Sequence, residues 1–345
     1  MGRVGSWLKE RVPVSPEAIK AAGNEPVAGH LKLWWFALGG TAAMLFFGQI
    51  ITGLLLCVYY QPTPERAWES VRYITAQVPY GWWIRSLHKW GANLMIVAVS
   101  LHLMRVFFSG AYRKPREVNW FIGVTLFLLT LVLGFTGYSI VYEQLSYWGA
   151  TVAANITESV PVIGKGLART LRGGEQIGGP TLSRFFILHA AVLPMLLLTL
   201  FAGHIALVRL HGVSEFPLKG QPHPAPYPFF PDHLLKELAT GLALITVVTC
   251  LSVLFPVSVG PPADPINTPE HIKPEWYFYF TFRWLKLSSL GMGILGVTVA
   301  VGVLFAWPLI DAAIRRRRPN SELSIAFGAA AVIVFVVFTV WEALS

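Results

Sequence analysis

Long apolar stretches separated by polar, proline-rich or glycine-rich segments recur seven times along the chain. They lie near residues 33–59, 82–108, 118–140, 184–210, 235–257, 289–310 and 323–344. Each is long enough to cross the hydrocarbon of a bilayer, about 30 Å, as a helix. The pattern therefore predicts an all-α integral membrane protein with seven transmembrane helices.

A proline-rich segment interrupts this pattern between the fourth and fifth stretches. Residues 217–231 read PLKGQPHPAPYPFFP, which cannot form a regular helix and is typical of a semi-rigid tether. It predicts a four-helix domain over residues 1–212, a linker over 213–233 and a three-helix domain over 234–345.

Composition and charge support a membrane protein. Hydrophobic residues make up 54% of the chain and charged residues 13%, about half the usual share in soluble domains. The formal net charge of +9 is explained by loop topology rather than by nucleic-acid binding, because basic residues gather in cytoplasmic loops. The short basic loops AYRKPRE and RRRR (315–318) place the N-terminus in the cytoplasm and the C-terminus outside. The longer loops 141–183 and 258–288 then lie outside and are candidates for surface helices.

Four histidines stand inside these apolar stretches. His88 and His102 are fourteen residues apart in the second, and His189 and His204 are fifteen apart in the fourth. Fourteen residues of α-helix rise about 21 Å and return to within roughly 40° of one face, and fifteen rise about 22 Å and overshoot by roughly 60°. The two helices run in the same direction, so His88 lies level with His189 and His102 level with His204.

Two facing imidazoles suit a six-coordinate, bis-histidine haem, which serves electron transfer. The matched heights therefore predict two b-type haems, held non-covalently and stacked across the membrane. The alternative is that these histidines are polar linkers between helices or proton-relay groups, as in a haem-free transporter.

Glycines and arginines add to the haem hypothesis. A flat macrocycle needs close helix backbones, which glycine permits, and arginine pairs with propionates. The glycines repeat the fourteen-residue interval in the first and third stretches. Each arginine lies one helical turn from a histidine, although snorkelling of its side chain to the membrane interface would explain its position equally well. These candidates are Gly39, Gly53, Gly123, Gly137, Arg85 and Arg105.

Several motifs resemble those of cytochrome b in the bc1/b6f family of quinol–cytochrome c oxidoreductases. RSLHKWGAN, GAYRKPREVNW, GFTGYS and PTLSRFFILH, within residues 30–212, are similar to cytochrome b6. PPADPINTPEHIKPEWYF, within residues 231–345, is similar to subunit IV. The resemblance implies a cytochrome b6-like part fused to a subunit IV-like part.

The resemblance also implies site residues. The Pro-Glu-Trp-Tyr motif at 274–277 would form the quinol-oxidising site, with Glu275 and Tyr277 as catalytic residues and Tyr138 lining the same site. Glu275 would accept a quinol proton, although the motif could also be an interfacial aromatic anchor. Arg209 and Glu237 would lie at an inner quinone site, or could be topology and helix-start charges.

The implied activity is that of the cytochrome b subunit of a bacterial bc-type complex in the cytoplasmic membrane. Quinol is oxidised at the outer face, and electrons pass through the two haems to an inner quinone, which adds to the proton gradient. The implied partners are a Rieske iron–sulfur protein, a c-type cytochrome subunit, quinone, the lipid bilayer and a second copy of the complex. A dihaem membrane anchor serving a dehydrogenase or reductase is the rival hypothesis.

One departure from the resemblance bears on the cofactors. Ala37 stands where cytochrome b6 has the cysteine that holds an extra haem, and neither Cys57 nor Cys250 lies in a haem-attachment motif. No covalent c-type haem is therefore expected on this chain.

Overall fold

The computed structural model describes residue 24 and residues 26–214 and 225–345. Residues 215–224 of the predicted linker lie outside these residues, and the linker is described over 213–214 and from residue 225 onward. Its described part includes β2 (Tyr227–Pro228), which pairs antiparallel with β1 (Pro26–Val27). The chain then enters the fifth long helix through η4 (Phe229–His233), where Phe230 keeps a non-helical backbone.

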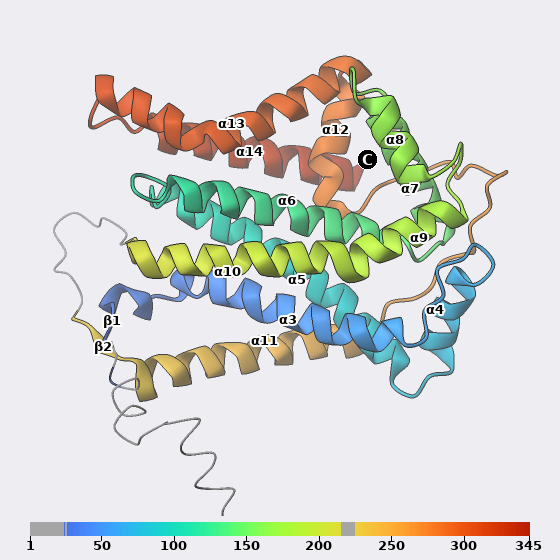
Figure 1. The fold of residues 1–345 in the computed structure, drawn as a ribbon, viewed down its shortest axis with the longest axis horizontal. Helices are drawn as coiled ribbons and strands as arrows, with labels where there is room; N and C mark the ends of the chain where they lie inside the picture. Colours follow the sequence, from blue (N-terminus) through green and yellow to red (C-terminus); the bar gives the residue numbers. More distant parts are fainter. Residues whose placement is uncertain (1–23, 25, 215–224) are drawn as a thin grey trace, which may run out of the picture.

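Seven helices among the described residues are long and apolar enough to cross a membrane, which confirms the predicted fold class. They run roughly parallel to one another across the molecule (Figure 1). They are α3 (Leu38–Cys57), α5 (Gly81–Phe108), α6 (Glu117–Ser139), the continuous rod of α9 (Gly179–Ile187), η3 (Leu188–Val192) and α10 (Leu193–His211), α11 (Leu234–Leu254), α13 (Leu290–Arg317) and α14 (Leu323–Leu344).

Shorter helices collect at one end of these rods. α7 (Gln144–Glu158) and α8 (Gly164–Arg172) lie in the loop where surface helices are expected, and α12 (Tyr279–Leu287) follows the one-turn helix η5 (Trp276–Phe278) in the other. The prediction missed α4 (Ala67–Ala76), although its buried Ala67, Val71 and Ile74 follow a helical interval. We call this the surface-helix end and the opposite end, which holds β1 and β2, the linker end (Figure 1). Two further turns at the linker end, η1 (Gly29–Lys32) and η2 (Trp34–Phe36), precede α3.

The outer faces of the long helices are apolar and exposed, as expected for contact with lipid. Leu242 on α11 is 67% exposed and Ile333 on α14 is 62% exposed. Side chains buried between α3, α5, α10 and α11 form an apolar cluster that includes Phe46, Met95 and Leu197. Met95 falls midway between the two histidines of α5, so this cluster forms an apolar layer across the middle of the bundle.

The three helices after the linker do not gather into one bundle of their own. α11 packs against α5 and α3 on one side, whereas α13 packs against α6, and α14 packs against α12 and α5, on the other (Figure 1). The predicted three-helix domain is therefore divided between two sides of the four-helix bundle.

The segment that joins α11 to α12 is fastened to the bundle by hydrogen bonds. Arg85 donates to the carbonyl oxygens of Val257 (2.8 Å) and Ser258 (3.1 Å). The carboxylate of Glu143, which precedes α7, accepts from the Gly260 backbone at 2.7 Å. Trp68 of α4 donates to the Gly260 carbonyl at 2.8 Å. The segment is therefore held against three elements of the N-terminal half.

A buried carboxylate at the surface-helix end binds α14 to α12. The side chain of Glu342 is fully buried, with Lys286 Nζ at 2.6 Å and Arg283 Nε at 3.4 Å. Lys273 donates to the backbone carbonyl of Glu342 at 3.2 Å. The last turn of α14 therefore supports both α12 and the segment that enters the Pro-Glu-Trp-Tyr motif.

A second buried carboxylate joins α13 to the N-terminal half at the linker end. Asp311, whose side chain is 2% exposed, lies 2.8 Å from Arg113 Nε and 3.1 Å from Arg315 Nε, and it accepts a hydrogen bond from Ser324. Arg113 belongs to the loop between α5 and α6, so this contact links the two parts of the chain.

We expect Asp311→Asn to lower the Tm of the detergent-solubilised protein by roughly 3–6 °C. Removing one partner of a buried ion pair costs about 3–5 kcal/mol, and the half-exposure of Arg113 moderates the loss. Glu322→Gln, which changes an exposed carboxylate at the start of α14, serves as the control and leaves Tm unchanged. Equal Tm values for both variants would show that the Asp311 contacts do not stabilise the fold.

Candidate functional site

The four predicted histidines come together as two facing pairs. The ring centroids of His88 and His189 are 6.2 Å apart, and those of His102 and His204 are 6.4 Å apart. The rings of each pair are nearly perpendicular, at 77° and 74°. The first pair lies toward the surface-helix end and the second toward the linker end, as the residue intervals predict.

This separation fits one metal held between two imidazoles. A coordinated nitrogen lies about 2 Å from its metal and the ring centroid roughly 1.2 Å farther, so two rings on opposite faces have centroids about 6.3 Å apart. Among the described residues, no cluster of three or more His, Cys, Asp or Glu side chains could hold an ion. The pairs therefore suit a macrocycle that brings the remaining metal ligands itself.

Hydrogen bonds at the surface-helix-end pair leave one nitrogen of each ring free to coordinate. Thr52 Oγ1 lies 2.9 Å from Nδ1 of His88 and donates its own proton to the Gly48 carbonyl at 2.7 Å, so it accepts from that nitrogen. The Leu133 carbonyl and Thr136 Oγ1 lie 3.1 Å and 3.2 Å from Nδ1 of His189. Both rings are thus protonated at Nδ1 and present Nε2 as a lone-pair donor.

Each predicted glycine faces one of the four rings. A Cβ atom at Gly137 would lie 2.6 Å from His189, one at Gly53 3.2 Å from His88, and one at Gly39 3.2 Å from His102. The fourth, at Gly123, would lie 3.5 Å from His204. Glycine on α3 and α6 therefore makes room for the rings of α5, η3 and α10.

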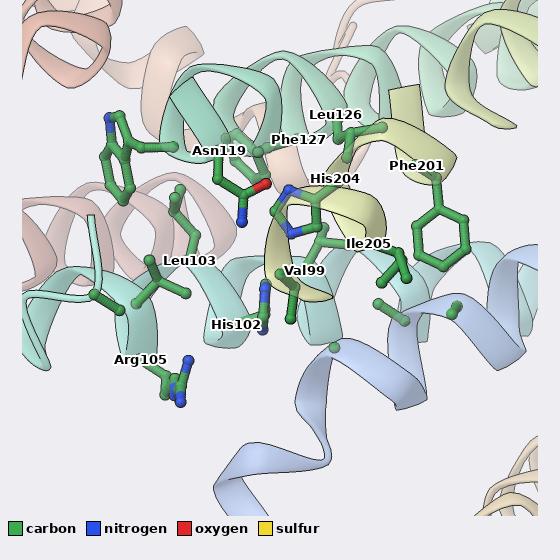
Figure 2. A pocket seen from close by; sticks show the side chains of 18 of the residues that line it. Val99, His102, Leu103, Arg105, Asn119, Leu126, Phe127, Phe201, His204 and Ile205 are labelled. Carbon is green, nitrogen blue, oxygen red and sulfur yellow. The ribbon is translucent and has the colours of Figure 1, made fainter. Parts of the chain in front are cut away.

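A cavity of about 270 Å³ surrounds the linker-end pair. Its lining includes His102, His204, Gly39, Gly123 and Arg105. Figure 2 shows His102 and His204 projecting into this space from α5 and α10, with Arg105 beyond His102 along α5 and Asn119 beside His204. The arrangement provides an apolar slot closed on two sides by imidazoles.

Arg105 is placed at the edge of this cavity. Its guanidinium carbon lies 4.2 Å from the centroid of the Phe36 ring, and Nη2 donates to the Ser214 carbonyl at 3.4 Å. Its Nε is buried without a hydrogen-bond partner among the described residues. A propionate oxygen would supply that partner, so the expected haem-pairing role fits Arg105. For Arg85 that role stays a prediction, because Arg85 hydrogen-bonds to the 257–258 backbone.

The residues predicted for quinol oxidation form a second cluster near His88. Glu275 is 16% exposed, and its Oε1 lies 2.5 Å from Nζ of Lys89. The same ammonium lies 5.7 Å from the centroid of the Tyr138 ring. Trp276 Nε1 donates to Oδ1 of Asn93 on α5 at 2.7 Å. The Pro-Glu-Trp-Tyr motif is therefore fixed against α5 and the end of α6.

Tyr277 completes this cluster in a buried position. Its hydroxyl lies 2.7 Å from where a Cβ atom at Gly134 would stand, so it packs against α6. Burial raises the pKa of Tyr277, and the nearby Glu275 and Tyr138 raise it further. The phenol consequently stays protonated at neutral pH and can donate a hydrogen bond.

The two residues predicted for an inner quinone site both lie toward the linker end. Arg209 is in the last turn of α10 and Glu237 in the first turn of α11. Oε2 of Glu237 lies 3.0 Å from where a Cβ atom at Gly40 would stand, which places the carboxylate against α3. Their joint role in binding quinone stays a prediction.

Sequence reasoning missed the polar partners of this site. Lys89 directly follows His88, and Thr52 and Thr136 each precede a ring-facing glycine. The repeated Thr-Gly pair in the first and third stretches is a signal that could have indicated them.

Two family descriptions match this chain. Cytochrome b/b6/petB matches residues 23–212, and Cytochrome b(C-terminal)/b6/petD matches residues 262–344. The chain belongs to the cytochrome b/b6 family. Members of this family generally bind two b-type haems.

Individual relatives agree with that membership. The chain is 38% identical to the cytochrome bc complex cytochrome b subunit of Chlorobaculum thiosulfatiphilum over 292 residues, 82% of this chain and 67% of that one. It is 42% identical to cytochrome b6 of Heliobacterium mobile over 210 residues, 61% of this chain and 99% of that one. The family therefore includes both separate cytochrome b6 chains and longer cytochrome b subunits.

A solved structure agrees as well. A chain of the hyperthermophilic respiratory Complex III has a TM-score of 0.77 and 26% identity, with 97% of this chain and 96% of that one covered. These likenesses support a multi-pass membrane protein that is the cytochrome b subunit of a Complex III-like oxidoreductase and works with partner subunits.

We expect Gly137→Ala to displace the His189 ring and to lower the haem-to-protein ratio of the purified cytochrome from two toward one. The new Cβ would stand 2.6 Å from the ring, closer than carbon atoms approach. Absorption spectra of the reduced protein, normalised to protein mass, measure the ratio. Gly48→Ala, with no atom within 4 Å of its new Cβ, is the control. A full haem complement in Gly137→Ala would mean that this close approach is not required.

Proposed function

We propose that this chain is the cytochrome b subunit of a quinol:cytochrome c oxidoreductase, or one with an equivalent acceptor, in the bacterial cytoplasmic membrane. It oxidises quinol at the surface-helix end, which faces outward, and reduces quinone at the linker end, which faces the cytoplasm. The N-terminus lies inside and the C-terminus outside.

The two histidine pairs carry this proposal. They stand at two levels of one bundle with an apolar layer between them, and each pair has the separation that one metal between two imidazoles requires. Bis-histidine haems bound there would supply one-electron transfer between the two membrane surfaces. His88 and His189 would hold the outer haem, and His102 and His204 the inner one.

Glu275 acts as the proton acceptor for quinol. The Lys89 ammonium stabilises its carboxylate and holds it beside Tyr138, and the Trp276 hydrogen bond to Asn93 fixes the backbone of the motif. Tyr277 donates a hydrogen bond to the bound quinol from its buried site. These groups would take up and orient the protons that quinol releases, and a haem held by His88 and His189 and a separate iron–sulfur partner would supply the two one-electron acceptors.

Partner proteins follow from the chemistry that this chain lacks. Among the described residues, no group of three or more His, Cys, Asp or Glu side chains could hold a metal, so the iron–sulfur centre resides on a Rieske protein and the onward carrier on a c-type cytochrome subunit. At the cytoplasmic side, Arg105 pairs with a haem propionate, and Arg209 and Glu237 serve the quinone site. The complex forms a homodimer in the bilayer.

A dihaem anchor for a dehydrogenase or reductase would use the histidine pairs equally well. It would leave the clamped Pro-Glu-Trp-Tyr motif and its Lys89 partner without a role, so the oxidoreductase accounts for more of the structure. Co-purification of a Rieske protein separates the two functions.

We expect His88→Ala or His189→Ala to remove the outer haem, and His102→Ala or His204→Ala to remove the inner one. Each substitution deletes one of the two imidazoles that would hold a haem and leaves the other level intact. A redox titration of the purified complex should lose one of two haem components in each variant. Two full haems after loss of both His88 and His189 would disprove the ligand assignment.

We expect Glu275→Gln to slow quinol oxidation by about 10²–10⁴-fold, as loss of a general base typically does. The amide keeps the volume and still accepts a hydrogen bond from Lys89, so haem spectra and assembly should be unchanged. Steady-state quinol:cytochrome c activity, normalised to haem content, measures the effect.

Trp276→Phe is the matched control for this test. It keeps an aromatic ring but loses the hydrogen bond to Asn93, and the catalytic role of Glu275 predicts only a modest effect. If the motif is an interfacial anchor instead, Glu275→Gln turns over at the wild-type rate and Trp276→Phe is the defective variant.

A further inference from the structure

The two histidine intervals differ by one residue, yet the two pairs have nearly the same geometry. One residue of α-helix adds about 100° of rotation and 1.5 Å of rise. Suppose that both helices were regular and that the two rings of one pair faced each other. The fourteen-residue interval in α5 and the fifteen-residue interval in the fourth span would then turn the two rings of the other pair about 100° away from facing each other. The observed centroid separations differ by only 0.2 Å (6.4 against 6.2 Å), and the ring angles by 3° (77° against 74°).

A change of helix type within the longer interval resolves this mismatch. Residues Leu188–Val192 form a single π-helical turn that begins at the residue before His189, whereas α5 is α-helical from Gly81 to Phe108. A π-turn closes with hydrogen bonds from residue i to i+5 and so takes up one residue more than an α-turn. The fifteen residues from His189 to His204 therefore advance about as far in phase as fourteen α-helical residues.

Pro194 accounts for the position of this turn. A proline ring lacks the N–H that would bond to the carbonyl four residues earlier and clashes with that carbonyl. For Pro194 that residue is Ala190, inside the π-turn, and widening the turn moves the carbonyl away. The second stretch carries no proline between His88 and His102, in keeping with its regular helix.

We propose that the π-turn at 188–192, held open by Pro194, sets the rotational register that lets a fifteen-residue interval face a fourteen-residue one. The turn is thus a positioning device for the His189 ring. The proposal rests on haem binding by the two histidine pairs, and wild-type protein with fewer than two haems would contradict that function rather than the role of the turn.

The test combines a point substitution with a deletion. Pro194→Ala allows the turn to close into α-helix, which rotates His189 away from His88 and should lower the haem-to-protein ratio from two toward one. Deleting Ala191 in the Pro194→Ala background leaves a regular helix with fourteen residues between the histidines and should restore the ratio to two. Ala191 is exposed, so its removal disturbs little packing.

A matched deletion in α5 provides the control. Val97 is also exposed and lies between His88 and His102, but its removal leaves thirteen α-helical residues with no π-turn to compensate. This variant should keep no more than one haem. The ratio is measured from reduced-minus-oxidised spectra, and a redox titration shows which component is lost; the linker-end component reports that a variant has folded.

Two results would overturn the proposal. Pro194→Ala with two haems at wild-type potentials would show that the proline does not hold the register. The second result concerns the Ala191 deletion in the Pro194→Ala background. If this protein folds but binds no more haem than Pro194→Ala alone, the π-turn does not compensate for the one extra residue in the interval.

Discussion

The structure depends on one distance, the roughly 6 Å that separates two imidazole rings at each of two levels in the bundle. A rigid separation of this kind cannot be met by apolar packing alone, because lipid competes equally well for apolar side chains. Glycines on α3 and α6 therefore admit the rings, and threonine hydroxyls and the Leu133 carbonyl orient the two at the surface-helix end. The π-turn in the fourth span keeps both levels in register.

The helices after the linker depend on this bundle rather than on one another. α11 covers one side and α13 and α14 the other, while the segment between them crosses the surface-helix end. Its hydrogen bonds to Arg85, Glu143 and Trp68 bring the Pro-Glu-Trp-Tyr motif to the residue that follows His88. The proposed quinol site and the surface-helix-end histidine pair consequently share one helix turn of α5.

Buried carboxylates secure the two ends of the C-terminal helices. Glu342 meets two cationic side chains at the surface-helix end, and Asp311 meets two others at the linker end. A charge buried near a membrane surface is costly unless it is paired, so such contacts specify where α13 and α14 dock. The middle of these helices needs only an apolar surface, which explains why their exposed residues are so uniform.

The sequence by itself determined the seven spans, the two levels of histidines and the glycines that oppose them. Hydropathy reports contact with lipid residue by residue, and an interval within one helix converts directly into height, so these features are local. It also indicated Glu275 and Tyr138 through the resemblance of their motifs. Contacts between helices are not local, and only the tertiary structure decided that Lys89 pairs with Glu275 and that Arg85 holds the 257–258 backbone. The same reason explains the rotation that was wrongly expected for His204. The calculation from the sequence assumed a regular helix, whereas the π-turn before Pro194 takes up the extra residue and brings the two histidines into phase.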